Sequence, residues 1–269
     1  MPSFLGIVSS AFVQQVLGNV LFSFGNNANG RTGLNTDSGN TLVPTQVGSD
    51  TNWTSASAGV FHSVAVRDGK LYSFGINANG RTGLNTTIGN TVVPTQVGSA
   101  TDWTSVNGSF NHSIAVGGGK LYSFGVNANG KTGLNTTSGE TLIPTQVGSA
   151  TDWTSASAGD NHSVAVRDGK LYSFGANSGG GTGLNTTSGN TLVPTQVGSD
   201  TDWDSASAGN THSVAIRDGK LYSFGDNANG RTGLNTTSGN TLVPTQVGSA
   251  TDWDSVSAGA HSLALKTSA

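Results

Sequence analysis

The sequence predicts an all-β protein, a five-bladed β-propeller built from four-stranded antiparallel blades. Three observations carry this prediction. A unit of about 50 residues occurs five times along the 269-residue chain. Each unit contains short segments of alternating side chains separated by turn residues, which is typical of short strands. No long stretch places apolar residues at the 3.6-residue spacing of a helix, so the repeats predict blades and not helical hairpins.

The repeat is defined by residues that recur at constant spacing. One tryptophan occurs in each unit, 50 residues after the previous one, and a proline follows the same interval. A histidine series keeps this interval until its last member, which comes one residue early. The two series are Trp53, Trp103, Trp153, Trp203, Trp253 and His62, His112, His162, His212, His261.

The first half of one unit reads as a β-hairpin. HSVAV (62–66) alternates, with Val64 and Val66 on one face, and predicts a strand. Residues 67–70 contain an Asp-Gly pair, the sequence typical of a tight hairpin turn. LYSFG (71–75) then predicts a second strand that places bulky aromatic rings on one face and small residues on the other, as packed blades require.

The second half of the unit predicts two further strands. After a long polar loop at 77–90, VVPTQV (92–97) reads as a third strand. Pro94 restricts it to a sheet edge or a strand start because proline has no N–H to donate. TDWTSVNG (101–108) supplies the fourth strand.

The two ends of the repeat array predict how the ring closes. LFSFG (21–25) has no histidine strand before it, and HSLAL (261–265) has no LYSFG strand after it. We expect these strands to pair and complete a fifth blade, which would remove both exposed sheet edges. Residues 18–269 then form one propeller domain. Residues 1–17 are left over, and AFVQQV (11–16) either competes for the closing position or projects; we favour a tether or docking segment.

Composition excludes several functional classes. Charged residues make up 10% of the chain, against about 25% in ordinary soluble domains. The formal net charge is −3 and no basic patch interleaves with aromatic residues, so nucleic-acid binding is not expected. The absence of cysteine excludes disulfides and thiolate metal sites. The N-terminal segment lacks a basic start and has a broken apolar run, so we expect neither a classical signal peptide nor membrane insertion.

Several linked motifs resemble the repeat of the regulator of chromosome condensation family. They are GKLYSFG followed by Asn and Gly, the proline, and WTSxSAG followed by HSVAV, and together they cover the chain from Gly18 onward. The resemblance implies a propeller of four-stranded blades. Members typically have seven blades, whereas this chain has five repeats. Where the family motif has Gln-Leu, four repeats have a basic residue followed by Thr, and the fourth repeat has Gly181-Thr182. No long insertion is present either. We therefore do not expect this chain to have the nucleotide-exchange activity of the family's eukaryotic founder. The near-identical copies look more like bacterial and phage members that serve as display scaffolds.

The recurring histidines and tryptophans are interpreted as structural. A ring of histidines could bind metal or sense pH, but the resemblance implies that each opens a strand and hydrogen-bonds a neighbouring loop. The tryptophans could stack on sugars, although their fixed place before a strand favours packing between blades. Residues 226–230 (DNANG) lack the register and terminal Glu of a calcium loop. We therefore expect no metal and no cofactor.

The copies differ mainly at two places, and these are the candidate binding residues. One is the pair just before each histidine and the other is the residue after each Phe-Gly. A partner-facing surface would explain the variation, and neutral change at exposed loops is the alternative. The candidates are Val60, Phe61, Phe110, Asn111, Asp160, Asn161, Asn210 and Thr211 in the first group, and Ile76, Val126, Ala176 and Asp226 in the second.

Repetition itself argues against catalysis. An active site needs an asymmetric cluster of groups, and near-identical repeats give every blade the same ones. The sequence therefore predicts a non-enzymatic structural or protein-interaction propeller. We expect a protein partner in a larger assembly, with a virion or cell-surface component anchored by residues 1–17 as the favoured setting. The alternative is a multivalent, lectin-like carbohydrate-binding propeller that uses the tryptophans and Asn-rich loops.

Overall fold

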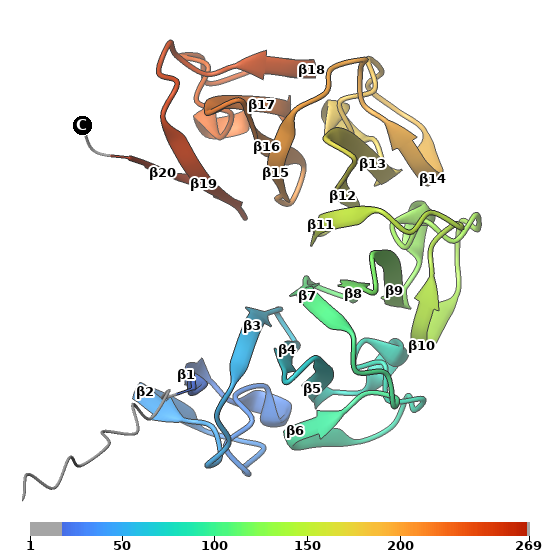
Figure 1. Cartoon of the computed structure of the whole chain (residues 1–269), viewed down its shortest axis with the longest axis vertical. Helices are drawn as coiled ribbons and strands as arrows, with labels where there is room; N and C mark the ends of the chain where they lie inside the picture. The colour runs from blue at the N-terminus through green and yellow to red at the C-terminus, as the bar shows by residue number, and fades with distance from the viewer. Residues whose placement is uncertain (1–17, 268–269) are drawn as a thin grey trace, which may run out of the picture.

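The computed structural model describes residues 18–267 and confirms the all-β, repeated architecture. These residues form twenty strands and five short 3₁₀ turns, with no α-helix in the described range. Four complete antiparallel sheets and two half-sheets follow one another along an arc (Figure 1). The complete blades are β3–β6 (Trp53–Ala58, His62–Arg67, Lys70–Ile76, Asn90–Gln96), β7–β10 (Trp103–Gly108, His112–Gly117, Lys120–Val126, Glu140–Gln146), β11–β14 (Trp153–Ala158, His162–Arg167, Lys170–Ala176, Asn190–Gln196) and β15–β18 (Trp203–Ala208, His212–Arg217, Lys220–Asp226, Asn240–Gln246).

The half-sheets lie at the two ends of the arc. At the N-terminal end, β1 (Phe22–Asn26) pairs with β2 (Asn40–Gln46), and at the C-terminal end β19 (Trp253–Ala258) pairs with β20 (Ser262–Lys266). The 3₁₀ turns η1 to η5 follow the LFSFG or LYSFG strand of each repeat, at Ala28–Gly30, Ala78–Gly80, Ala128–Gly130, Ser178–Gly180 and Ala228–Gly230. Each blade therefore begins with the Trp strand, so the fourth strand of a unit read from its histidine belongs to the next blade.

Local sequence explains the shape of one blade. Asp68 and Gly69 both have positive φ, 49° and 71°, which is the geometry of a two-residue hairpin turn, and they join β4 to β5. The ladder runs from His62↔Gly75 to Arg67↔Lys70. Pro94 lies where the register between β5 and β6 shifts, and β6 is the outer edge of the sheet. A proline at this position removes no ladder hydrogen bond.

Neighbouring blades pack through a repeated aromatic contact. The ring of Phe124 on β9 is fully buried against Val64, Leu71 and Val97 of the preceding blade. Gly83 forms the floor of this socket, and a Cβ there would lie 2.9 Å from the phenylalanine ring. Its φ of +70° also favours glycine. The same contact is made by Phe74 with Gly33, Phe174 with Gly133 and Phe224 with Gly183.

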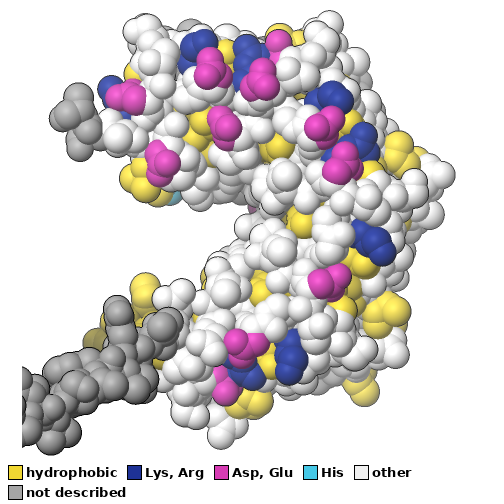
Figure 2. Space-filling view, in the orientation of Figure 1, with side chains coloured by type: hydrophobic (Ala, Val, Ile, Leu, Met, Phe, Trp, Pro, Cys, Tyr) yellow, Lys and Arg dark blue, Asp and Glu magenta, His cyan; other side chains and the backbone are white. Residues whose placement is uncertain are grey.

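The ends of the arc do not meet. The structure contains β1–β2 and β19–β20 as separate two-stranded sheets, and the predicted pairing of the C-terminal strand with LFSFG is not made among residues 18–267. The two ends stand on opposite sides of a notch in Figure 1, and the notch stays open in the space-filling view of Figure 2. The repeated blade contacts fix the turn from one blade to the next, and four such contacts do not complete a circle.

Charged side chains are few, and several of them pair with an opposite charge. Basic and acidic groups stand next to one another on the face seen in Figure 2. Arg67 pairs with Asp50 and also lies over the Tyr72 ring, 4.4 Å from its centroid. Arg167 and Arg217 repeat this arrangement in their own blades.

Two sequence predictions concern the chain's attachment. The predicted tether, residues 1–17, lies outside the described residues. Within residues 18–267, no helix is long and apolar enough to cross a membrane.

Candidate functional site

The two variable positions of each repeat lie side by side in the structure. The residue after each Phe-Gly donates its backbone N–H to the residue just before the histidine of the same blade. Ile76 donates to the carbonyl of Phe61 over 3.1 Å, and Asp226 donates to that of Thr211 over 3.1 Å. Val126 with Asn111 and Ala176 with Asn161 repeat this bond at 2.9 Å. The candidate binding residues therefore form one surface, which we call the variable face.

A shared depression of about 350 Å³ opens on this face at the inner rim of the arc. Its walls are the loops that connect the Trp strand of each blade to the His strand. Glycine and alanine form most of the lining, and one variable side chain from each complete blade adds to it. These side chains are Val60, Phe110, Asp160 and Asn210.

One half of the variable face is aromatic. Phe61 and Phe110 meet edge to face with their centroids 4.9 Å apart and their planes at 73°. The Arg81 guanidinium lies 4.9 Å from the Phe61 centroid and that of Arg31 lies 5.7 Å from it. Arg31 also donates to the Val60 carbonyl over 2.6 Å. Cations at this distance from a ring are attracted by its quadrupole, so the two arginines hold the Phe61–Phe110 pair in place.

The other half is polar. Lys131 Nζ donates to the Asp160 carbonyl over 3.1 Å, and burial lowers the pKa of this lysine. Burial raises the pKa of Asp160, while the nearby Lys131 charge opposes that shift. Asn161 Nδ2 donates to the Asn210 carbonyl over 3.0 Å. The variable face therefore presents a different surface at each complete blade.

Sequence reasoning missed the basic residues behind this face. Arg31, Arg81, Lys131 and Arg231 occupy the position where the family motif has glutamine, and the fourth repeat has Gly181. Arg231 donates to Thr211 Oγ1 over 2.8 Å and lies 3.7 Å from the Asp226 carboxylate. The departure from the family motif was visible, but the basic residues lie 20 or 29 residues in sequence from the pre-histidine residues to which they donate hydrogen bonds. Only the fold brings them together.

The histidines connect neighbouring blades and do not form a ring of metal ligands. His62 Nε2 lies 2.7 Å from the hydroxyl of Ser113 on the next blade, and His112, His162 and His212 make the same contact with Ser163, Ser213 and Ser262. The partner of Nε2 is thus a serine on a strand of the next blade and not a loop, whereas Nδ1 of His112 also contacts a loop, through the Ser109 hydroxyl at 2.9 Å. The serine hydroxyl donates its single proton onward to a backbone carbonyl, as in Ser163 to Lys131 over 2.9 Å. The histidine must therefore donate from Nε2.

Burial explains the protonation state of these rings. The pKa of His62 is lowered to about 3 by burial and by the Arg81 charge. Burial likewise lowers the pKa of His162 and of His212 to about 4. The rings are therefore neutral at physiological pH. The side chain of His261 is exposed at the end of the arc.

The tryptophans pack on their own blade and in apolar clusters shared with the preceding blade. Trp53, Trp103, Trp153 and Trp203 are buried, and each meets the tyrosine of its own blade edge to face, at 4.8–5.4 Å between centroids. Trp253, in the C-terminal half-sheet, is half-buried. A sugar cannot stack on a ring whose faces are covered, so the four buried tryptophans do not supply a carbohydrate platform.

No cluster of three or more metal-ligating side chains occurs within residues 18–267. In the segment that faintly resembles a calcium loop, the Asp226 carboxylate accepts a hydrogen bond from the Ala228 N–H over 3.0 Å. The same carboxylate faces Arg231. It therefore stabilises the η5 turn and the variable face.

Comparison with known proteins shows that several solved structures share this architecture. The chain is 21% identical to human WBSCR16, with a TM-score of 0.80 over 92% of this chain and 67% of that one. It is also 21% identical to Prp20p from Saccharomyces cerevisiae, with a TM-score of 0.76 over 93% of this chain and 65% of that one. In a complex described as Kap60 bound to yeast RCC1 (Prp20), the TM-score is 0.78, at 21% identity, over 93% of this chain and 63% of that one. The chain thus spans about two thirds of the length of these proteins. No curated protein matches it.

The repeat itself matches a described family. The regulator of chromosome condensation (RCC1) repeat matches five consecutive segments, at 19–66, 68–116, 118–166, 168–216 and 218–265. These segments are the five units read from the tryptophan, proline and histidine spacing, and they cover nearly all of the described residues. The chain belongs to the regulator of chromosome condensation (RCC1) repeat family.

Proposed function

We propose that this chain is a non-enzymatic interaction propeller whose variable face binds a protein partner. The observation that carries the proposal is the gathering of the variable residues. In a chain of near-identical repeats, one variable side chain from each complete blade lines a shared depression, and the other variable positions adjoin these residues. Among the structural neighbours, Prp20p is described as binding Gsp1p and histones. That description supports the class of partner and identifies no partner for this chain.

The aromatic half of the face is the expected centre of binding. Phe110 and Val60 are among the exposed large apolar side chains, and Phe61 supports Phe110 from the side. Aromatic and arginine side chains supply most of the binding energy in many protein interfaces. Here both occur together, with the arginines already ordered by backbone hydrogen bonds. A partner with an apolar anchor would fit this half, and its polar groups would meet Asp160 and Asn210.

The test compares matched surface variants. Phe110→Ala removes the anchor, and Ile88→Ser removes a more exposed apolar side chain from a remote loop where the other four copies have Ser. Proteins captured from native extract are identified by mass spectrometry and then titrated against each variant. We expect one partner whose affinity falls at least about tenfold with Phe110→Ala and not with Ile88→Ser. Equal affinity for both variants would overturn the assignment of the variable face.

Attachment through residues 1–17 to a virion or cell-surface assembly is proposed on the sequence alone. Removing these residues should detach the propeller from the assembly and leave its near-UV circular dichroism unchanged. Attachment to the assembly that persists after this deletion would contradict this part of the proposal. The carbohydrate-binding alternative loses its main support, because the tryptophans it needs are buried.

A further inference from the structure

We propose that the two half-sheets are the two halves of one blade, and that a second copy of this chain completes each of them head to tail. The occupant of each open end is thus the opposite end of another copy. The evidence is a set of repeated contacts. Each of them is made four times along the arc, and its fifth instance is missing. In every case, one partner of the missing contact lies at one end of the arc and the other partner at the opposite end.

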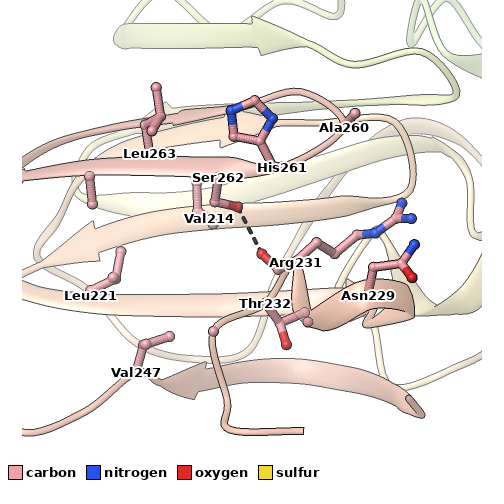
Figure 3. Close-up of a pocket in the computed structure, with 13 residues that line it drawn as sticks. Val214, Leu221, Asn229, Arg231, Thr232, Val247, Ala260, His261, Ser262 and Leu263 are labelled. Carbon is pink, nitrogen blue, oxygen red and sulfur yellow. Dashed lines mark hydrogen bonds between the residues drawn. The ribbon is translucent and has the colours of Figure 1, made fainter. Parts of the chain in front are cut away.

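The first missing contact is the aromatic plug. Phe74, Phe124, Phe174 and Phe224 each fill a socket in the preceding blade. The fifth phenylalanine, Phe24 on β1, is 65% exposed. The fifth socket is open at the other end of the chain, a pocket of about 350 Å³ lined by Val214, Leu221, Gly233 and Val247 (Figure 3). A Cβ at Gly233 would meet only Val247 and no aromatic ring among the described residues.

The second missing contact joins an asparagine to the next blade. Asn85 donates its backbone N–H to the Leu142 carbonyl over 2.9 Å, and Asn35, Asn135 and Asn185 repeat this bond. The Leu142 side chain packs on Gly80 of the preceding blade. In the fifth repeat the donor position is Asn235 and the floor is Gly230, which no leucine reaches in the described structure. The corresponding leucine is Leu42 at the N-terminal end, and it is 87% exposed.

The third missing contact is the histidine–serine bond. Four histidines reach the serine of the following blade. His261 is exposed at the C-terminal end. Ser63 at the N-terminal end donates to the Arg31 carbonyl over 2.8 Å, so its oxygen keeps the lone pairs that the other serines offer to a histidine. No described histidine uses them.

The fourth is the strand ladder itself. In the blade β3–β6, Val64 pairs with Ser73, and Ser63 pairs with Phe74. The equivalent residues on β20 and β1 would pair Leu263 with Ser23, and Ser262 with Phe24. Leu263 is 65% exposed, whereas its equivalent Val64 is buried. Gly25 has no neighbour within 4 Å of a built Cβ, although the equivalent Gly75 packs on His62.

One other segment of this chain could pair with the free edge of β1, but its sequence suits that position less well. AFVQQV (11–16) aligns with the strand before LYSFG, but it places Gln14 and Gln15 where Val64 and Ala65 are buried. Burying two amides without partners is unfavourable. β20 instead offers Leu263, Ala264 and Leu265, with His261 in register. A second copy can also make these contacts with the blade-to-blade turn unchanged, whereas closure within one chain requires every contact to bend further.

The experiment uses the cysteine-free background. Ser23→Cys and Leu263→Cys are made in separate chains, since the equivalent ladder pair lies within the Cα range that a disulfide allows. When the two proteins are mixed and oxidised, we expect a covalent heterodimer with this single linkage on peptide mapping. Each variant alone should give little dimer. A doubly substituted chain should give a ladder of covalent multimers.

Three matched variants test the socket. Phe24→Ala removes the plug and Gly233→Ala fills the socket floor, and each should reduce the yield of heterodimer at least about tenfold. Ile88→Ser should leave it unchanged. A heterodimer that forms equally well in all variants would overturn the proposal, as would its absence. A double variant that oxidises only to a monomer with an internal disulfide would show that the chain closes on itself.

Discussion

At the scale of single residues, the histidine–serine–carbonyl chain fixes which nitrogen of the imidazole carries the proton. A serine hydroxyl has one proton, and here it is donated to a carbonyl of the preceding blade, so the imidazole must supply its own proton from Nε2. The neutral ring fits this arrangement. A protonated ring would carry its charge into a site that no solvent reaches.

This constraint predicts acid sensitivity. The pKa of buried His162 is lowered to about 4, so the unfolded chain takes up a proton between about pH 6.5 and 4 that the folded chain does not. Stability should be complete above this window and fall as the pH drops through it, by about 2 kcal/mol at pH 5 for this residue. Urea unfolding at pH 7.5 and 5 measures the loss.

The control for this prediction keeps the hydrogen bond and removes the titration. In His162→Gln the amide can still donate to Ser213, but it cannot be protonated. We expect the pH dependence of the unfolding free energy to be shallower than in the unchanged chain, while Ile88→Ser should behave as the unchanged chain does. The same pH dependence in all three proteins would contradict the assignment.

At the scale of elements, the contact between one blade and the next depends on a glycine beneath a phenylalanine. Gly133 has φ of +71°, and its hypothetical Cβ would lie 2.9 Å from the Phe174 ring. Gly233 has nearly the same φ, +70°, but its socket holds no ring among the described residues. The two positions therefore share backbone strain and differ in packing.

Substituting alanine at each position separates the two effects. Both variants should lose about 1 kcal/mol from the left-handed backbone. Gly133→Ala should lose a further 1–3 kcal/mol or so, because the phenylalanine must move. Urea unfolding at low protein concentration, where chains are apart, gives the difference. Equal losses would mean that the socket does not hold the blades together.

The repeat, its strands and its turns could be predicted from the sequence, because tryptophan, histidine and proline spacing and the Asp-Gly pair act locally. The partner of each histidine could not, since Ser113 lies 51 residues from His62 on another strand. Nor could the open arc. The angle between neighbouring blades is set by how Phe124 packs on Gly83. The spacing of these two residues in the sequence does not reveal that angle. The variable positions were visible by comparing repeats, but only the fold shows that they adjoin Arg31 and Arg81.

At the scale of the whole molecule, each blade contacts only its neighbours. Repeat proteins of this kind have a stability that sums over units and their interfaces. Removing residues 119–168, one complete unit, joins equivalent positions and should leave a folded, shorter arc. We expect near-UV circular dichroism of the same form and a urea m-value that falls roughly in proportion to length. A chain that loses its tertiary signal would show that the arc folds only as a complete set.

The curvature of the arc also limits what two copies can do. The described part of one copy already runs around most of a circle in Figure 1. Two copies joined head to tail therefore exceed one turn and cannot lie flat in one ring. The joined arcs must rise out of the plane, because unlike ends that do not close generate a helical assembly.

The break in the ring falls in the middle of a blade and not between blades, and this has a consequence for how such a gene can change. Unequal recombination between near-identical copies adds or removes whole units of 50 residues. Wherever the exchange occurs, the first half-sheet and the last half-sheet remain, with Phe24 at one end and its socket at the other. The number of blades can thus vary from one descendant to the next while the joint between molecules is inherited unchanged.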